Sequence, residues 1–494
     1  MAAATTTNIA AMLDRPAELV ADRPALILDD GTVCTYGRLR AETLRWADTL
    51  AAHGVGVGDT AALVDWGGVR STAVTLAAAR LGAATAQMNP RLTSGELAQL
   101  VEVSGCVAVG VADDEAVPGL AEAMGALGHV LQAPDEGAAG AGPDQAAPGE
   151  DTDVLVLFTS GTTGLPKPVG VTHAALAARM GAYRAPFDAE RAPNVSLMCV
   201  PSFHVGGMLG LLLNLWSGDT TVIQPRFDAG AWLALVAEHR VTSAFLVPTM
   251  LARVLDHPDL ETTDLSSLRA VAYGAAAAPV DLVRRAMDQW PDVAFANVFG
   301  QTETLGAYTT LSPADHRDPA RAGSVGRPLP GVEVRLVDPD TGQDVAPGHV
   351  GELWVRGAQN VRHGWLETGD LARQDADGYL YPTGRRSDGI NRGGEKFAPH
   401  EVADVLRRHP AVADVVVVGL PDPEMGERVG TAVVVAPGQD PPTLDELREW
   451  CRGDLAPFKL PEVVAVVDAL PSNELGKLPR PMAVELIESH RSRP

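Results

Sequence analysis

A glycine-rich loop placed directly after an apolar run is the feature that most constrains this chain. The run Val154–Phe158 has the length and composition of a buried strand, and a helix-like segment begins at Thr172. The loop between them, Thr159–Lys167, carries hydroxyl side chains, two glycines and a terminal Lys. Glycines let backbone N–H groups approach phosphate oxygens, and hydroxyl and ammonium groups add further donors. The segment therefore favours an anion-binding turn within an α/β fold.

The loop differs from the common P-loop motif. Two residues separate Gly164 from Lys167, and Pro168 stands where that motif requires Ser or Thr. Taken alone, such a loop is an ordinary flexible turn as readily as a phosphate site. Its interpretation depends on the motifs that accompany it.

Lysine is scarce, with four lysines among the 39 Lys and Arg residues. Codon bias explains the scarcity, because Ala and Gly are also abundant. The surviving positions are still informative, since Lys is a compact point charge on a flexible stem whereas Arg is a planar fork. The four are Lys167, Lys396, Lys459 and Lys477.

Length and charge bound the class of protein. A chain of 494 residues exceeds what one core supports, so two or three domains are expected. The net charge of −24 disfavours nucleic acid and anionic membranes as partners, because binding to a phosphate backbone relies on basic surface. An anionic substrate must therefore be held by a local site against the field of the whole protein.

Cysteine usage and apolar segments indicate the compartment. Cys34, Cys106, Cys199 and Cys451 are scattered without a CxxC pair, a pattern that favours neither a disulfide framework nor a zinc site and fits a reducing cytoplasm. The N-terminus has no basic residues before its apolar part, so no signal peptide is predicted. The longest apolar stretch, Val205–Trp216, is too short to span a bilayer.

Strand-like and helix-like segments alternate through the first two thirds of the chain, which predicts parallel sheets covered by helices. Strands are expected at Val195–Val200, Ser243–Val247, Leu268–Tyr273 and Phe295–Val298, and helices at Tyr36–His53, Ser71–Leu81, Ala231–His239, Met250–Asp256 and Pro279–Gln289. Ala133–Glu150 is predicted to be a surface loop. From Val332, short strands separated by Gly, Pro and Asp turns indicate a barrel-like piece.

A small α+β unit is predicted after Arg386. Its expected elements are the helices His400–Arg408 and Leu444–Cys451 and the strands near Val415–Val418 and Ala432–Val435. The main domain boundary is placed at Arg386–Ser387, which gives domains 1–386 and 387–494.

Four further motifs follow the loop in order. Phe299–Glu303 follows a predicted strand, and Thr368–Asp370 is expected to be a turn that presents a carboxylate. Gly384–Arg385 precedes the run Ile390–Lys396, and Leu470–Lys477 lies near the end. In this order they resemble the adenylate-forming superfamily, which comprises acyl- and aryl-CoA synthetases, luciferases and the adenylation domains of peptide synthetases.

The resemblance covers Tyr36 to Lys477 and implies a fold and a reaction. The expected fold is α/β, with a large N-terminal domain of two sheet-and-helix subdomains plus a small β-barrel, and a smaller mobile α+β C-terminal domain. The expected reaction is activation of a carboxylic acid by ATP and Mg²⁺ as an acyl-AMP, with CoA as a co-substrate. The protein is expected to be a monomer or homodimer.

Residue roles follow from the same resemblance. Lys477, Thr302 and Glu303 are the expected catalytic residues, with Thr302 on the α-phosphate and Glu303 as the Mg²⁺ ligand. Asp370 and Arg385 are the expected partners of the ribose hydroxyls. The full set of expected ATP-binding residues is Thr159, Ser160, Gly161, Thr162, Thr163, Gly164, Lys167, Gly274, Ala275, Ala276, Asn297, Phe299, Gly300, Asp370 and Arg385. The chemistry of the reaction supports these residue types. The carboxylate of the acid and the α-phosphate of ATP are both anions, so positive charge must stabilise the transition state in which they meet.

The acid pocket is expected along Pro201–Gly207 and Tyr273–Pro279, where small side chains leave room for a flat ring. The substrate-binding residues are expected to be Phe203, His204, Gly207, Tyr273, Gly274, Gly300 and Thr304. His204, which lies between Phe203 and Val205, is also compatible with a structural role. A flat aromatic acid is the leading substrate class, because Phe299 and the run Ile390–Lys396 resemble ligases of aryl acids. Gly393 and Gly394 are expected to line a tunnel for the thiol.

Two departures from the family pattern concern the second half of the reaction. Gly364-Trp365 follows Arg356-Gly357 almost immediately, where the family has a longer insert. The hinge position, normally Asp or Lys, is Ser387. Adenylation is therefore better supported than thioester formation.

Four functions remain open. The leading one is a carboxylate–CoA ligase acting through acyl-AMP, and the second is a stand-alone aryl-acid adenylating enzyme that loads a carrier-protein thiol. The third is an atypical member that forms an amide, or that activates nitrite with ATP to diazotise an amino-aryl acid. The fourth is a non-catalytic nucleotide-binding or scaffold protein, against which Lys477, Glu303 and Asp370 argue.

Overall fold

The chain forms two compact units in the computed structural model, which describes residues 8–490 except 108, 113–128, 131–139, 141, 145, 147–148, 150, 160–165, 184, 340, 393–394, 398 and 472–477. The first unit comprises Met1–Pro319, Pro328–Glu333 and Arg356–Leu366. The second comprises Ala320–Arg327, Val334–Val355 and Glu367–Pro494. The boundary predicted at Arg386–Ser387 stays a prediction.

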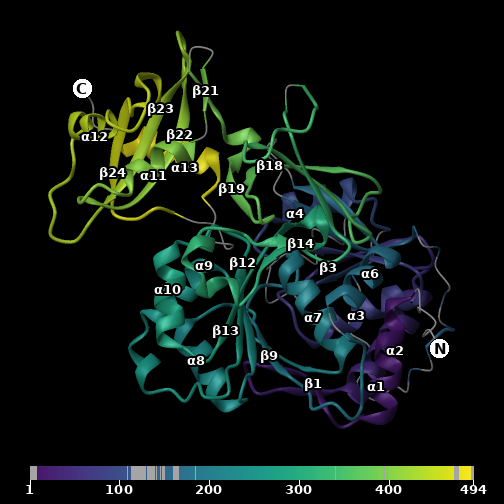
Figure 1. The fold of residues 1–494 in the computed structure, drawn as a ribbon. Helices are drawn as coiled ribbons and strands as arrows, with labels where there is room; N and C mark the ends of the chain where they lie inside the picture. The colour runs from purple at the N-terminus through teal and green to yellow at the C-terminus, as the bar shows by residue number, and fades with distance from the viewer. Residues whose placement is uncertain are drawn as a thin grey trace. The chain divides into compact units, whose positions relative to one another are not determined.

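A nine-stranded sheet is the larger of two sheets in the first unit. Its strand order is β15-β14-β13-β12-β11-β9-β10-β1-β2. The strands are β1 (Pro24–Leu28), β2 (Val33–Thr35), β9 (Val195–Met198), β10 (Thr220–Ile223), β11 (Ser243–Leu246), β12 (Ala270–Gly274), β13 (Ala294–Gln301), β14 (Gly306–Leu311) and β15 (Arg327–Pro328). Neighbours from β1 through β13 pair in parallel, whereas β2 and β14 are antiparallel to their partners. Helices α8 (Ala229–Glu238), α9 (Pro248–Leu255) and α10 (Val280–Gln289) lie beside strands β12 and β13 (Figure 1).

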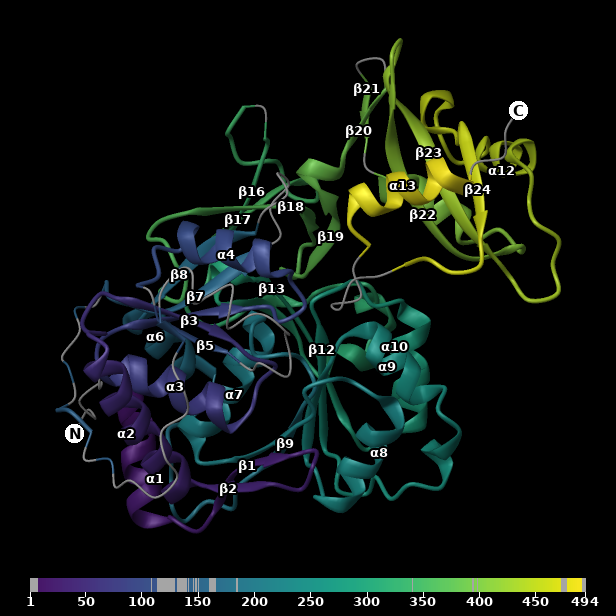
Figure 2. The same ribbon diagram turned by 180° about the vertical axis from the view of Figure 1, so that it is seen from behind.

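A six-stranded sheet of order β6-β5-β3-β4-β7-β8 forms the other layer. Its strands are β3 (Thr60–Val64), β4 (Ala84–Met88), β5 (Val109–Ala112), β6 (His129–Val130), β7 (Asp153–Thr159) and β8 (Lys167–Thr172). Helices α2 (Tyr36–Ala52) and α3 (Val69–Arg80) lie on one side of this sheet and α4 (Ser94–Val103) on the other (Figure 2). The other α-helices that the structure describes in this unit are α1 (Asp14–Leu19), α6 (His173–Tyr183) and α7 (Val205–Ser217), and the 3-10 helix η1 (Ile9–Leu13) precedes α1.

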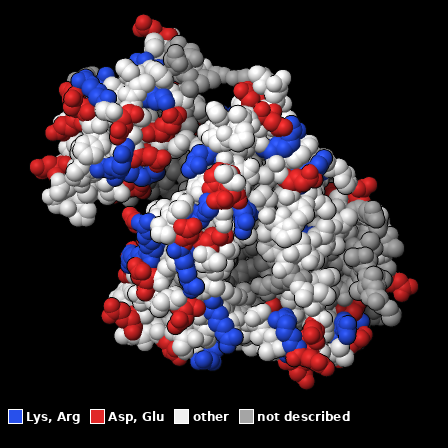
Figure 3. Space-filling view, in the orientation of Figure 1, with Lys and Arg blue, Asp and Glu red and all other residues white. Residues whose placement is uncertain are grey.

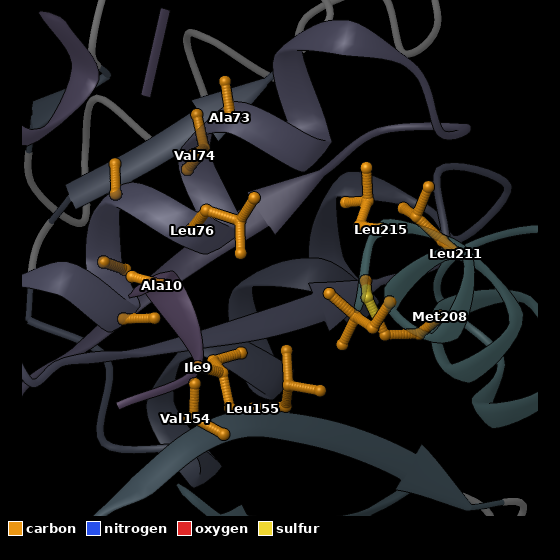
Figure 4. Packing of buried hydrophobic residues seen from close by; sticks show 14 of the residues in the cluster. Ile9, Ala10, Ala73, Val74, Leu76, Val154, Leu155, Met208, Leu211 and Leu215 are labelled. Atoms are coloured by element: carbon orange, nitrogen blue, oxygen red, sulfur yellow. The ribbon is translucent and has the colours of Figure 1, made fainter. Parts of the chain in front are cut away.

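One apolar cluster joins the two sheets of the first unit. It collects side chains from η1, α3, β7 and α7, including Ile9, Leu76, Val154 and Leu211 (Figure 4). Each of these four side chains is nearly or fully buried. Because such a closely packed apolar cluster resists displacement, it holds the strand ends that carry the predicted motifs in fixed positions.

Helix starts follow capping side chains. The hydroxyl of Thr93 accepts the N–H of Glu96 while the Glu96 carboxylate accepts the N–H of Thr93, which forms a capping box at α4. Asp228 caps α8 by accepting the N–H of Ala231. These local signals fix where the two helices begin, although no helix was predicted from the sequence over α4 and the start of α8 was placed at Ala231, two residues late.

The second unit contains most of a four-stranded sheet and a five-stranded sheet. The first has the order β16-β17-β18-β19, and the second β21-β20-β23-β22 with β24 parallel to β23. The strands are β16 (Glu333–Val337), β17 (Gly351–Arg356), β18 (Leu366–Gln374), β19 (Leu380–Arg385), β20 (Ile390–Arg392), β21 (Glu395–Phe397), β22 (Val412–Asp422), β23 (Gly426–Val435) and β24 (Val463–Val467). Its helices are α11 (Pro399–Leu406), α12 (Leu444–Cys451) and α13 (Arg480–His490).

The α/β fold predicted from the sequence is confirmed, whereas the small barrel stays a prediction. One local expectation is wrong. Thr368–Asp370 is no free turn, because it lies within β18 and Asp370 pairs with Arg385 of β19. The helix expected from Thr172 begins at His173, and it is preceded by strand β8, which was not predicted. Within the part of the chain that the structure describes, no helix is long and apolar enough to cross a membrane.

Candidate active site

The hairpin β7–β8 positions both ends of the glycine-rich loop. Thr159 and Lys167 are direct partners in its antiparallel register. The loop residues between them that were expected to bind ATP, Ser160, Gly161, Thr162, Thr163 and Gly164, lie outside the described residues. The structure therefore places the base of the loop at the carboxyl end of β7, next to the parallel strand β4.

The end of β12 combines a close approach with a strained backbone. A Cβ on Gly274 would lie 2.1 Å from the carbonyl oxygen of Val298, so only Gly fits this position beside β13. The next residue, Ala275, has φ of +66°, a conformation that costs energy for any residue with a side chain. Ligands of open α/β sheets bind at the carboxyl ends of parallel strands, and the predicted ATP contacts Gly274, Ala275 and Ala276 lie at such an end.

Buried Tyr273 and partly buried His316 form a polar pair beside this strand end. The Tyr273 hydroxyl lies 2.9 Å from Nε2 of His316, and Nδ1 of His316 lies 2.7 Å from the carbonyl oxygen of Ser312. A carbonyl only accepts, so Nδ1 carries the proton and Nε2 accepts from the tyrosine. Burial raises the pKa of Tyr273 to about 12, and burial lowers the pKa of His316 below its ordinary value. Both groups are therefore neutral near pH 7.

A β-bulge in β13 shapes the wall around Phe299 and Gly300. The register with β14 shifts between these two residues. A Cβ on Gly300 would lie 2.0 Å from the carbonyl oxygen of Gly306, so the close approach requires Gly. The Phe299 ring packs edge-on against Tyr308 with centroids 5.3 Å apart. In the same strand, the carbonyl of Asn297 accepts a hydrogen bond from Thr310 Oγ1 at 3.0 Å.

A tight turn presents Thr302 and Glu303 directly after the bulge. Thr304, which is fully buried, accepts the N–H of Gln301 and also bonds the carbonyls of Gln301 and Gly306. The Glu303 carbonyl accepts the N–H of Val361. The hydroxyl of Thr304 is thus committed to holding the turn, and its expected contact with the substrate stays a prediction.

Glu303 is compatible with Mg²⁺ held through nucleotide phosphates. Among the described residues, no group of three His, Cys, Asp or Glu side chains could form a cage of protein ligands around a metal. Mg²⁺ does not need such a cage, because it commonly takes one or two carboxylates plus substrate phosphates and water. A single carboxylate in a rigid turn fits that pattern.

The segment Phe203–Gly207 lies at the start of α7. His204 occupies the N-cap position, and its ring centroid lies 4.6 Å from that of Phe203. Trp66 packs edge-on against Phe203 at 6.2 Å. A Cβ on Gly207 would lie 2.2 Å from the carbonyl oxygen of Pro201, so the helix requires Gly here. The structure thus supplies an aromatic group at this strand-to-helix junction.

In the second unit, Asp370 and Arg385 face each other across β18 and β19. Nε of Arg385 lies 2.8 Å from Oδ1 of Asp370, and the Asp370 side chain is mostly buried. Asp370 follows Gly369, whose φ is +73°. A carboxylate accepts from ribose hydroxyls and a guanidinium donates to them, so the pair has the chemistry expected of it.

The remaining predicted residues are only partly described. Lys477, Gly393 and Gly394 lie outside the described residues. Ser387 belongs to the 3-10 helix Arg386–Asp388, but its side chain is not described. Lys459 forms an ion pair with Glu401 at 2.5 Å and lies near the rings of Phe397 and Phe458. This supports a structural position for Lys459, to which no catalytic role was assigned.

Charge on the visible surface is mixed. Acidic and basic side chains are interspersed over the face shown in Figure 3, rather than gathered by sign. With a net charge of −24, binding of an anionic nucleotide therefore depends on local donors such as those at the strand ends above.

Comparisons with known proteins agree with this geometry. The AMP-binding enzyme family matches residues 13–365, and the AMP-binding enzyme C-terminal domain matches residues 401–477. A feruloyl-CoA synthase from Amycolatopsis sp is 35% identical over 470 residues, covering 91% of this chain and 93% of that protein. The fatty acid–[acyl-carrier-protein] ligase ScoC from Streptomyces coeruleorubidus is 32% identical over 481 residues, covering 92% of each. The amide bond synthetase McbA from Marinactinospora thermotolerans has a similar structure, with a TM-score of 0.82 and 30% identity over 97% of this chain and 99% of that one.

The fold and the strand-end site define an α/β enzyme that uses a nucleotide. More specifically, the chain belongs to the AMP-binding enzyme family, as the motif resemblance predicted, and it is an ATP-dependent, AMP-forming ligase.

Proposed function

We propose that this protein activates an aromatic or small acyl carboxylic acid as its acyl-AMP and transfers the acyl group to the thiol of CoA. The observation that carries the proposal is the arrangement of β12 and β13. Gly274 pairs with Val298 across these parallel strands, so the strained end at Ala275 and the turn bearing Thr302 and Glu303 belong to adjacent strand ends. ATP and an acid both fit a site of this kind, with the nucleotide at the strand ends and the acid along Gly300.

In the first step, a carboxylate oxygen of the acid attacks the α-phosphorus of ATP. A phosphorus–oxygen bond forms to the acid, the bond to the β-phosphate oxygen breaks, and pyrophosphate leaves. Thr302 donates its hydroxyl to the α-phosphate, and Lys477 neutralises the charge that develops there. Mg²⁺, when bound by Glu303 and the phosphates, supplies further positive charge.

In the second step, the thiol sulfur attacks the acyl carbon and AMP leaves. We assign the thiol path to Gly393 and Gly394 and the pivot between the two steps to Ser387, which is small enough to absorb a backbone rotation. The feruloyl-CoA synthase similarity supports CoA as the acceptor and an aryl acid as the substrate.

Two alternatives have their own support. Transfer to a carrier-protein thiol is favoured by the similarity to the ScoC ligase, and amide formation by the similarity to McbA. ATP-dependent activation of nitrite to diazotise an amino-aryl acid remains a variant of the third possibility, supported only by the family resemblance.

The test has two stages. Acid-dependent exchange between pyrophosphate and ATP over a broad acid panel checks adenylation. Release of AMP is then measured with CoA, with a phosphopantetheinylated carrier protein, with an amine, and with nitrite plus an amino-aryl acid, and products are identified by mass spectrometry. Acid-dependent exchange without thioester in the CoA reaction overturns the CoA assignment, and absence of exchange with every acid overturns adenylation.

A further inference from the structure

Arg179 is a fully buried arginine without an acidic partner. It lies on α6 and is 1% exposed. Its Nη2 donates to the Tyr183 hydroxyl at 3.0 Å and to the carbonyl of Ala307, and the guanidinium lies 4.0 Å from the Tyr183 ring centroid. Among the described residues, no carboxylate is within ion-pair distance of Arg179, and its Nε has no hydrogen-bond partner.

Such an arrangement is unfavourable in the free protein. A buried charge is costly unless it is paired and hydrogen-bonded, and two neutral acceptors do not replace a counter-charge. Burial accordingly lowers the pKa of Arg179. Arg191 shows the usual solution in the same unit, because it pairs with the fully buried carboxylate of Asp219 at 2.7 Å.

The position of Arg179 connects it to the predicted acid site. Gly306 and Ala307, which adjoin the guanidinium, lie in β14, and Ala307 is the register partner of Gly300 at the bulge. A Cβ on Gly306 would lie 3.4 Å from Nη2 of Arg179 and 3.0 Å from Cδ2 of Leu209 in α7. The guanidinium of Arg179 therefore contacts β14, the strand that pairs with Gly300, and α7 packs against both α6 and β14.

We propose that Arg179 binds a second acidic group, a carboxylate or an acidic phenol, at the end of the substrate distant from the carboxylate that is adenylated. The inference rests on the proposed function, because it assumes that an acid lies along Gly300. The guanidinium supplies the planar fork that matches a carboxylate, and the Tyr183 hydroxyl holds its orientation. The bound anion would provide the counter-charge that the described residues lack. Arg179 is thus a specificity residue of the acid site.

The experiment compares matched acids in pyrophosphate exchange. Each pair shares a skeleton and differs only in the distal group, such as benzoate with benzene-1,4-dicarboxylate, and cinnamate with 4-carboxycinnamate. The wild type, Arg179→Met, Arg179→Lys and the control Arg191→Met are measured, with thermal unfolding of each. Arg191→Met removes a second arginine of the same unit, one that is partly buried, and controls for general destabilisation.

We expect the wild type to favour the acid-bearing member by at least about tenfold in kcat/KM, because an unmatched buried charge rejects the neutral analogue. Arg179→Met should lose that preference, and Arg179→Lys should keep part of it. Arg191→Met should lower kcat/KM by the same factor for both acids of a pair. A wild type without the preference, or an equal loss for both members in Arg179→Met, overturns the inference even if that variant is unstable, because the wild-type ratio is measured independently. If pyrophosphate exchange occurs only with acids that lack a distal acidic group, this inference fails but the proposed function stands. If no acid supports exchange, the proposed function fails.

Discussion

The hydroxyl of Tyr273 donates to Nε2 of His316 at 2.9 Å, which ties the end of β12 to a segment 43 residues further along the chain. Ser312 fixes the histidine tautomer through its carbonyl. Tyr273→Phe should lower the free energy of unfolding by about 1 kcal/mol, the usual net value of a hydrogen bond. Urea unfolding of Tyr273→Phe, His316→Ala and the double variant measures the coupling. Strictly additive losses would show that the two side chains do not interact.

Gly300 has the closest backbone approach among the described glycines of the candidate site. A side chain there meets the backbone of Gly306, which cannot move without breaking the β13–β14 pairing. Gly300→Ala should cost about 3 kcal/mol of stability and abolish acid-dependent pyrophosphate exchange.

A matched control for this variant is Gly181→Ala in α6. A Cβ on Gly181 meets nothing within 4 Å, so the substitution should be neutral or stabilise by about 0.5–1 kcal/mol through helix propensity. If Gly300→Ala behaves as Gly181→Ala does in thermal unfolding and in exchange, the backbone of Gly306 does not exclude a side chain at position 300, and the prediction is wrong.

The sequence predicted the elements well because their signals are local. The strand predicted at Val154–Phe158 and the helix predicted at Tyr36–His53 depend on residues within a few positions of each other, and the structure has them as β7 and α2. Strand β13 was predicted to end at Val298 but continues to Gln301, since the bulge lets pairing with β14 resume. A bulge is set by the partner strand and cannot be read from one segment.

The candidate site divides in the same way. Motif residues such as Glu303 and Asp370 were predicted from the sequence because they belong to ordered motifs, and their roles stay predictions. Arg179 and His316 were missed because no local pattern marks them. Their partners Ala307 and Tyr273 are 128 and 43 residues away, so only the fold brings these groups together.

His173 should make stability depend on pH. It is fully buried, its Nδ1 accepts the N–H of Ile9 at 3.3 Å, and burial lowers its pKa from 6.5 to about 4. The unfolded chain therefore takes up a proton first as the pH falls, so this contribution is complete above pH 6.5 and is lost between pH 6.5 and 4. The loss amounts to up to about 3 kcal/mol. Urea unfolding of the wild type and His173→Gln across this range checks it, and parallel profiles for the two proteins would contradict the assignment.

Lys477 is expected to act on the transition state rather than on ATP binding. Lys477→Ala should lower acid-dependent pyrophosphate exchange by at least about 10²–10³-fold, because it removes the positive charge that meets the developing charge on the α-phosphate. ATP affinity, measured by calorimetry, should change little. Lys459→Ala is the matched control, since Lys459 is engaged by Glu401 in the same unit, and its exchange rate should fall far less. Equal rates in Lys477→Ala and the wild type would defeat the proposed mechanism, and equal losses in both lysine variants would assign Lys477 a general structural role.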